Sequence, residues 1–382
     1  MKRVFEHLSG DRVIWMIVII LSFFSLLAVY SSTGTLAYHY KGGHTEFYLM
    51  KHLSILVLGL GLMYAAHLVP YKYYSRIAQL LIYISIPLLL ITLFKGTNLN
   101  EASRWLTLPL INLSFQTSDL AKLALIMYVA RLLSKKQGEI KDFKSALIPI
   151  MAPILITVVL ILPANFSTAA VLFSTSLVLL FIGRINMKYI FSIIGIGLVG
   201  FLIMILIAKS NPDVLPRLGT WMSRIENFSD KNSEGNYQAE QAKIAIATGN
   251  FFGKMPGNSV QRNFLPHPYS DFIFAIIIEE YGFFGGIIIV LLYLILLYRA
   301  VRIASNSPGT FGAFLSMGLA FSLVFQAMIN MMVAVNLLPV TGQPLPMLSM
   351  GGTSIWFTSI SLGIILSVSK ESTEKLEEYA TA

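Results

Sequence analysis

The residues of this sequence that are best suited to chemistry are charged groups at the edges of long apolar segments. Asp271 follows the stretch Leu265-Pro266-His267-Pro268 and opens the apolar run 272–278. The two prolines keep the preceding segment out of a regular helix, so Asp271 is predicted near a helix start at a membrane surface. A carboxylate at such a boundary can abstract a proton. It can equally neutralise the positive end of the helix dipole, so both interpretations stay open.

Glu279 and Glu280 lie further along the same apolar run. Glu279 would stand about 12 Å deeper than Asp271 on a regular helix. Carboxylates inside a membrane are costly and face a bundle interior or a wet cavity. Glu279 is therefore either a contact for a polar substrate or a partner in a buried hydrogen bond.

Asp119 and Lys122 stand three residues apart at the start of the fourth apolar segment, where an ion pair on one helix face is predicted. Lys122 could simply neutralise Asp119. Alternatively, Lys122 and Arg104, from the loop before it, could hold an anion such as a phosphate at the membrane surface. Histidines and acids do not cluster at metal-ligand spacing, so no metal site made by the protein is predicted.

The connection before the last apolar segment contains three prolines, three glycines and several hydroxyl groups. Thr341, Ser349 and Gly352 belong to it. Irregular backbone at membrane depth persists only where protein or a watery cavity covers it. This connection is therefore predicted to line a cavity.

The elements that must position these residues are membrane-spanning helices. Of the 382 residues, 55% are hydrophobic and 12% charged, about half the charge of a soluble protein. Apolar runs near the length needed to cross about 30 Å of hydrocarbon recur throughout. The sequence predicts an all-α, polytopic membrane protein that forms one domain over 1–382, with a large outer loop at 209–270. The ten predicted spans are 13–33, 50–69, 74–94, 117–133, 145–162, 167–183, 188–208, 271–298, 310–335 and 347–369.

Basic residues indicate the orientation of these spans. The two ends and the even-numbered connections contain most of the lysines and arginines, whereas the opposite short connections hold only Lys41, Lys51, Lys95 and Arg104. Both termini are therefore predicted to be cytoplasmic. Basic residues scattered over short loops do not form a nucleic-acid groove, and no GxxxxGK[ST] phosphate loop is present. The outer loop 209–270 is predicted to be ordered, with a helix over 236–249 that ends on a glycine.

Several separate stretches resemble the SEDS family (shape, elongation, division and sporulation), whose members include FtsW and RodA. The resemblance covers nearly the whole chain. It rests on Arg104-Trp105 with 116–122, on Gly235-Asn-Tyr237-Gln238 with 249–253, on 265–283, and on 339–354. Asp119 stands where the family usually has Glu. Asn165 stands where an acid is common, which puts any essential carboxylate at that position in doubt.

The resemblance implies a peptidoglycan glycosyltransferase of the bacterial cytoplasmic (inner) membrane that polymerises lipid II, a disaccharide-pentapeptide on undecaprenyl pyrophosphate. Asp271 aligns with the family's essential aspartate and is the expected general base. Arg104 and Lys122 would stabilise the pyrophosphate. Further residues expected to contact the substrate or its pyrophosphate are Asp119, Gln238, Glu279, Thr341, Ser349 and Gly352.

No tightly bound cofactor is expected, but a divalent cation (Mg or Mn) could accompany the pyrophosphate. The expected partner is a class B penicillin-binding transpeptidase, together with other membrane proteins of the division or elongation machinery. The amino-acid sequences of 337–346 and 351–356 are nearer to those of FtsW, which predicts a role in cell division. A RodA-like role in elongation and cell shape, and a lipid II flippase, are the alternatives. A flippase would gather its site near the membrane midplane.

Overall fold

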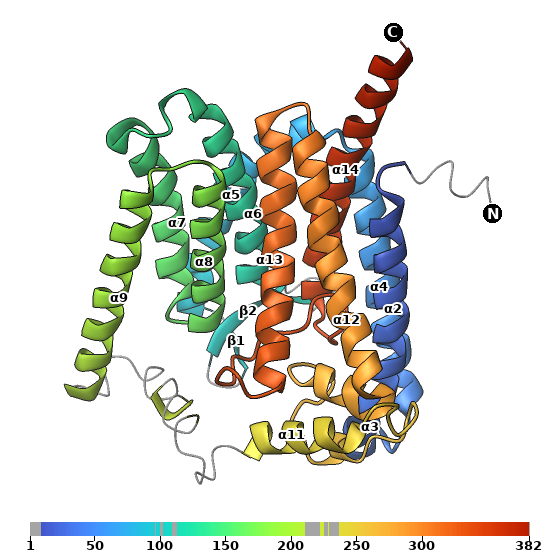
Figure 1. Ribbon diagram of the computed structural model, residues 1–382. Coiled ribbons are helices and arrows are strands. Elements are labelled where there is room, and N and C mark those ends of the chain that lie inside the picture. Colours follow the sequence, from blue (N-terminus) through green and yellow to red (C-terminus); the bar gives the residue numbers. More distant parts are fainter. Residues whose placement is uncertain are drawn as a thin grey trace.

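The computed structural model describes residues 9–95, 97–99, 102–108, 113–210, 222–224, 228 and 237–381. In this part of the chain, eight helical segments are long and apolar enough to cross a membrane (Figure 1). They are α2 (Arg12–Ser32), α4 (Thr45–Leu68), α5 (Tyr71–Lys95), the π-helical turn η2 (Phe143–Leu147) continuing into α7 (Ile148–Ile161), α9 (Met187–Ser210), α12 (Ile273–Asn306), α13 (Thr310–Ala334) and α14 (Thr353–Thr381).

Two further helices complete the bundle. The helix α8 (Phe166–Ile182) is apolar but has only 17 residues, and α6 (Thr117–Lys135) carries charged side chains in its first turns. A 3-10 turn, η1 (Gln137–Glu139), follows α6. Each of the ten predicted ranges therefore contains a helix, and the predicted multi-pass helical fold is confirmed.

The chain enters α2 and leaves α14 at the same end of the bundle (Figure 1). The opposite end carries the short helix α3 (Gly34–Lys41), the helix α11 (Tyr237–Gly249), the 3-10 turn η5 (Gln261–Asn263) and a small sheet. The helix predicted over 236–249 is present as α11. Most of the part of the loop 209–270 that comes before α11 lies outside the described residues.

A small three-stranded antiparallel sheet, which the sequence did not predict, accompanies the helices. It consists of β1 (Thr97–Leu99), β2 (Ala102–Leu108) and β3 (Leu113–Gln116), in that order. The register pairs Trp105 with Gln116 and Leu106 with Phe115. Because β3 runs directly into α6, the sheet fixes where that helix begins.

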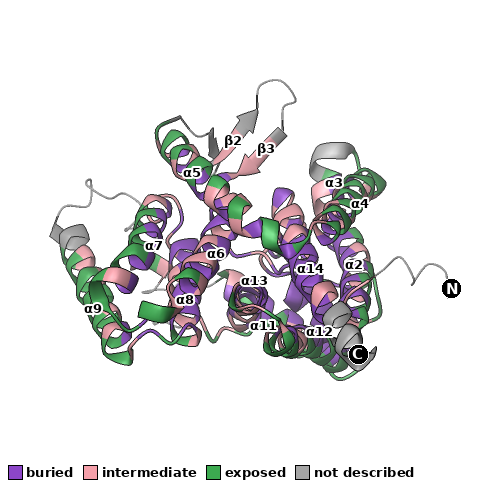
Figure 2. Cartoon of the chain, turned by 90° about the horizontal axis from the view of Figure 1, so that it is seen from above, coloured by how far each residue is buried: buried purple, intermediate pink, exposed green. Residues whose placement is uncertain are grey.

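The buried core follows the helices nearest the centre of the bundle (Figure 2). In the most apolar stretch of each helix, 72% of the residues of α14 and 67% of those of α13 are buried, compared with 6% of those of α9. The helix α9 lies at the edge of the bundle in both views. Any site inside the protein must therefore be built mainly on α13, α14 and their neighbours.

The helix α12 is interrupted at Gly282, whose φ of +71° belongs to the left-handed region. A Cβ on this residue would lie 2.3 Å from the carbonyl oxygen of Phe251, so only glycine fits. The segment after α11 binds to the break: the amide of Phe283 donates to the carbonyl of Asn250 at 2.9 Å, and the amide of Lys254 donates to that of Glu279 at 2.9 Å. The span predicted over 271–298 is present, but it is not one unbroken helix. The helix starts at Ile273, breaks, and extends to Asn306.

The last helix also starts later than its predicted boundary at 347. Pro344 and Pro346 lack amide donors, and Met347 and Gly352 have left-handed φ values of +64° and +54°. These features keep the chain irregular until Thr353, where α14 begins.

Candidate active site

A cavity of about 330 Å³ lies at the end of the bundle that carries the sheet. Segments far apart in the sequence line it: the sheet, α6, the start of α8, the segment before α12 and the connection before α14. The lining residues that could take part in chemistry are Trp105, Gln116, Asp119, Lys122, Asn165, His267, Tyr269, Ser270, Asp271, Gln343, Gly352 and Ser354.

Four helices begin at this cavity. Gln116 is the N-cap of α6, Asn165 is the N-cap of α8, Asp271 lies two residues before α12, and Gly352 immediately precedes α14. Each helix start carries partial positive charge and unpaired amide groups. Since all four residues line the cavity, the fold favours anionic groups there.

Asp271 is held in the cavity wall through its own backbone and its neighbour. The Ser270 hydroxyl donates to Oδ1 of Asp271 at 2.8 Å. The side-chain amide of Asn330, from α13, donates to the Asp271 carbonyl at 2.8 Å. The other carboxylate oxygen faces Gly342, where an added Cβ would lie 3.5 Å away. The structure therefore places the predicted base in the cavity with its backbone fixed.

The connection 336–352 is fixed to the segment that carries Asp271. The Ser349 hydroxyl donates to the Ser270 carbonyl at 2.6 Å and accepts from the Leu345 amide at 2.8 Å. The Met350 amide donates to the Tyr269 carbonyl at 2.9 Å. Gly352 lines the cavity, Thr341 precedes the lining residue Gly342, and Ser349 supports the wall rather than lining it.

The helix α13 holds the same connection from the other side. The Asn330 side-chain amide also donates to the Gln343 carbonyl at 2.7 Å, and the Gln326 amide donates to the Pro344 carbonyl at 2.9 Å. Gln343 in turn donates to the hydroxyl of Thr168 in α8 at 2.9 Å. Asn330 and Gln326 belong to no pattern that marked them in the sequence, whereas Gln343 lies in the connection that was predicted to line a cavity.

Lys122 and Asp119 form the predicted ion pair, with 2.8 Å between Nζ and Oδ1. Their side chains are 15% and 6% exposed, so the pair is largely removed from water. Lys122 also donates to the side-chain oxygen of Gln326 at 3.2 Å. Both charged groups line the cavity, which makes Lys122 available to a bound anion.

Glu279 and Gln238 do not line the cavity. Glu279 is fully buried and pairs with Lys254 at 2.7 Å. It also accepts from the Ser259 hydroxyl and from the amides of Val260 and Gln261. These contacts fasten the outer segment to α12, which is the structural alternative left open by the sequence. Gln238 lies in the first turn of α11.

Glu280 has a parallel role, because it accepts hydrogen bonds from the hydroxyl of Ser31 in α2 and from the amide of Ser259. Arg104 belongs to β2, and its side chain lies outside the described residues.

Arg224 is a cavity neighbour that the sequence did not reveal. Its guanidinium donates to the Val340 carbonyl at 3.1 Å, two residues from Gly342 in the cavity wall. Burial lowers the pKa of the Arg224 guanidinium, and the nearby charge of Asp271 opposes this shift. A single arginine in a polar loop shows no periodicity, so no pattern in the sequence could have singled it out.

The fold and the cavity define a polytopic membrane protein with a polar site at one end of its helix bundle. The family model of the cell cycle proteins FtsW, RodA and SpoVE matches residues 11–374, so the chain belongs to this family.

Relatives agree with this assignment, and solved structures agree with the fold. The chain is 33% identical to a probable peptidoglycan glycosyltransferase FtsW of Geobacter sp. (strain M18), over 94% of this chain and 96% of that protein. It is 32% identical to stage V sporulation protein E of Bacillus subtilis (strain 168), over 95% and 98%. The crystal structure of the rod shape determining protein RodA of Thermus thermophilus superposes with a TM-score of 0.68 at 24% identity, covering 95% of this chain and 97% of that one.

A chain of a peptidoglycan synthase complex, whose structure relates polymerization to crosslinking, superposes with a TM-score of 0.70. It is 24% identical and covers 95% of this chain and 98% of that one.

Proposed function

We propose that this protein is a peptidoglycan glycosyltransferase that polymerises lipid II on the outer face of the bacterial cytoplasmic membrane. One observation carries the proposal: the cavity brings a carboxylate, Asp271, together with a cation, Lys122, and the beginnings of four helices. A base and a strongly anion-binding wall are what transfer of a sugar from a pyrophosphate requires.

In the proposed reaction Asp271 takes the proton of the acceptor sugar's 4-hydroxyl group. The oxygen attacks the anomeric carbon of the donor, and the bond from that carbon to the lipid pyrophosphate breaks. Lys122, the helix starts and Arg104 stabilise the charge that develops on the leaving pyrophosphate. Asp119 holds Lys122 in place, and the proton remains on Asp271 until solvent removes it.

A divalent cation would enter with the substrate in this proposal. Among the described residues, no group of three His, Cys, Asp or Glu side chains could hold a metal ion. One oxygen of the cavity carboxylate Asp119, Oδ2, is buried with no hydrogen-bond partner in the described structure, so this residue could contact such an ion. The ion would neutralise charge on the pyrophosphate. Polymerisation should then depend on added Mg²⁺ or Mn²⁺ and stop with a chelator.

The size of the inner cavity favours a polymerase over a flippase. Further along α6 than the outer cavity, the bundle contains a second cavity of about 30 Å³, lined partly by Ser322, Ser354 and Ser361. This volume suits one or two water molecules. A polar head group of disaccharide size would need a far wider path. Asp119 and Lys122 line both cavities, whereas Asp271 lines only the outer one.

The proposed cellular role is division, because the sequences of 337–346 and 351–356 resemble those of FtsW. Elongation and sporulation are the alternative roles. The proposed partner is a class B penicillin-binding transpeptidase. Localisation of a fluorescently tagged chain decides among the roles: midcell supports division, the sidewall supports elongation, and appearance only during spore formation supports a SpoVE-like role.

The direct test of the activity is polymerisation of lipid II by full-length protein in liposomes, alone and with a class B transpeptidase. Asp271→Ala and Asp271→Asn should each lower the rate at least about 100-fold, because general base catalysis contributes about that much or more. Lys243→Gln, a change at an exposed position of α11, is the control. Normal polymerisation by folded Asp271→Ala protein would contradict the proposal.

A further inference from the structure

Arg224 is a half-buried cation of the outer segment with no role in the reaction described so far. Its guanidinium binds the carbonyl of Val340, in the connection that forms one wall of the cavity. The same connection meets Asp271 two residues further on, since an added Cβ on Gly342 would lie 3.5 Å from Oδ2 of Asp271. The carboxylate is therefore close enough for its charge to oppose the loss of the Arg224 proton. A guanidinium remains protonated in proteins and offers five donors, of which the bond to Val340 uses one.

The charges around Asp271 differ in how far they are already neutralised. Among the described residues, the other titratable side chains that line the cavity are Asp119 and Lys122 from α6, and His267 and Tyr269 from the segment before α12. Lys122 is paired with Asp119 at 2.8 Å. His267 shares a hydrogen bond with the Tyr269 hydroxyl at 3.1 Å. Arg224 is then the permanent cation whose interaction with Asp271 is not offset by a second carboxylate in the described structure.

We propose that Arg224 is a positioning residue for Asp271: it keeps the carboxylate ionised, and therefore able to accept a proton, while the connection 339–342 holds the guanidinium in place. This inference rests on the proposed function of Asp271 as the base. A fixed cation beside a carboxylate favours its charged form. The bond to Val340 links the same guanidinium to the cavity wall, so Arg224 would fix the position of this wall relative to Asp271.

The alternative role for such an arginine is direct binding of the substrate pyrophosphate. The two roles predict different kinetics. The acid limb is the fall of the rate at low pH, where the base becomes protonated. Loss of a cation that acts on the base raises the pKa of the carboxyl group, so the acid limb moves to higher pH. Loss of a pyrophosphate ligand raises KM for lipid II and leaves the pH profile where it was.

The experiment measures kcat and KM for lipid II between pH 5 and pH 9, with full-length protein in liposomes. Arg224→Gln should move the acid limb of kcat/KM up by about one pH unit, with KM changed less than about twofold and activity recovered at high pH. Arg224→Lys keeps the charge and should leave the limb near that of the unmodified protein. Lys243→Gln removes one positive charge from the exposed surface of the same outer region and should change neither quantity.

Three results would overturn the inference. They are an unchanged acid limb with a raised KM, an unchanged limb with unchanged KM, and inactivity of correctly folded Arg224→Gln protein at every pH. Folding is checked by thermal unfolding in detergent, and if Arg224→Gln fails to fold, the comparison is made with Arg224→Met. If the unmodified protein does not polymerise lipid II, the proposed function fails first, and that failure is visible before any variant is compared.

Discussion

Lys122 meets two partners in the cavity wall, a carboxylate and an amide oxygen. The sequence predicted the first through the three-residue spacing on one helix face. It could not predict Gln326, because that residue comes from α13, about 200 positions away. The same reason explains why Asp271 was found and Arg224 was missed: Asp271 stands at a local boundary between prolines and an apolar run, whereas Arg224 acquires its partner only through the fold.

The buried pair should reveal itself through a difference between single and double variants. Lys122→Met leaves Asp119 buried and unpaired, and we expect a loss of about 3 kcal/mol in stability. The double variant Asp119→Leu/Lys122→Met removes both charges and should recover most of that loss. Both variants should fail to polymerise lipid II at the normal rate. Thermal unfolding and activity are measured on the same preparations, and equal stability of the single and double variants would contradict the prediction.

Asn165 has a local role that can be separated from the cavity. Its side-chain oxygen accepts from the Thr168 amide at 3.2 Å and caps α8. Asn165→Ala should cost about 1 kcal/mol, seen as a lower thermal midpoint, because the cap is lost. Asn165→Asp keeps an acceptor at the same place and should unfold at the midpoint of the unmodified protein. A midpoint for Asn165→Asp as low as that for Asn165→Ala would rule out capping as the role.

At the scale of elements, the apolar runs predicted every helix of the bundle, because their length reflects the membrane itself. The sequence did not reveal the sheet, whose strands have three, seven and four residues. Nor did it reveal the break in α12, because the hydrophobic pattern passes through Gly282 without a change. The break depends on the backbone of 250–254, which pairs with α12 from about 30 residues away.

Gly282→Ala tests this break. A Cβ would meet the Phe251 carbonyl at 2.3 Å and would force a side chain into the left-handed region. We expect destabilisation of at least about 1 kcal/mol and easier proteolysis of the outer segment. Gly61→Ala is the matched control, since nothing lies within 4 Å of a Cβ at that exposed position of α4. If the two substitutions gave the same thermal midpoint and the same cleavage, the break would not hold the outer segment.

Asn330 joins two elements of the site, because one amide group donates both to the Asp271 carbonyl and to the Gln343 carbonyl. Asn330→Asp keeps the size but replaces the donor with a negatively charged acceptor, and should lower kcat about tenfold by loosening Asp271, with a small change in KM. Asn330→Gln keeps a donor on a longer side chain and should retain more activity. Equal rates for the two variants would show that donation by this residue does not matter.

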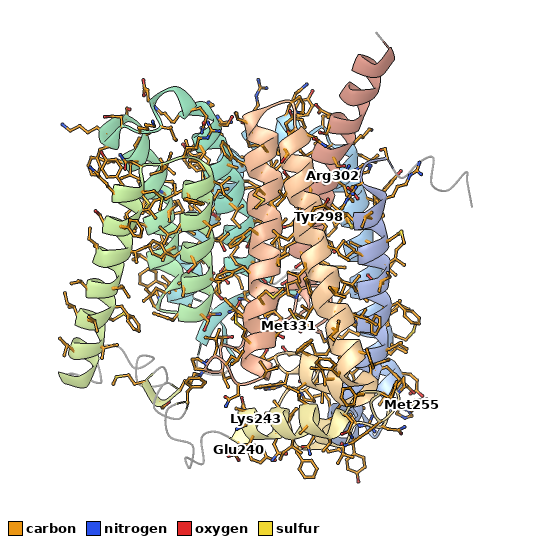
Figure 3. All side chains as sticks on the ribbon, viewed as in Figure 1. Glu240, Lys243, Met255, Tyr298, Arg302 and Met331 are labelled. Atoms are coloured by element: carbon orange, nitrogen blue, oxygen red, sulfur yellow. The ribbon has the colours of Figure 1, made fainter. Side chains whose placement is uncertain are left out.

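At the scale of the whole molecule, the start of α2 and the end of α14 lie at one end of the bundle, and we propose that this end is cytoplasmic. The chain has no cysteine, so single cysteines can report the orientation. Figure 3 places Lys243 on α11 at one end of the protein and Arg302 towards the other. An impermeant maleimide added to intact cells should label Lys243→Cys and should label Arg302→Cys only after permeabilisation. The reverse pattern would invert the orientation.

The break at Gly282 also determines which part of α12 must match the thickness of the bilayer. The 24 residues from Phe283 to Asn306 span about 36 Å, somewhat more than a typical hydrocarbon core of about 30 Å. A change in lipid chain length is met by tilting this straight part. The turns before the break are joined to the outer segment, and the segment that carries Asp271 is joined to the connection before α14. Asp271 is therefore expected to keep its height relative to the lipid head groups in membranes of different thickness.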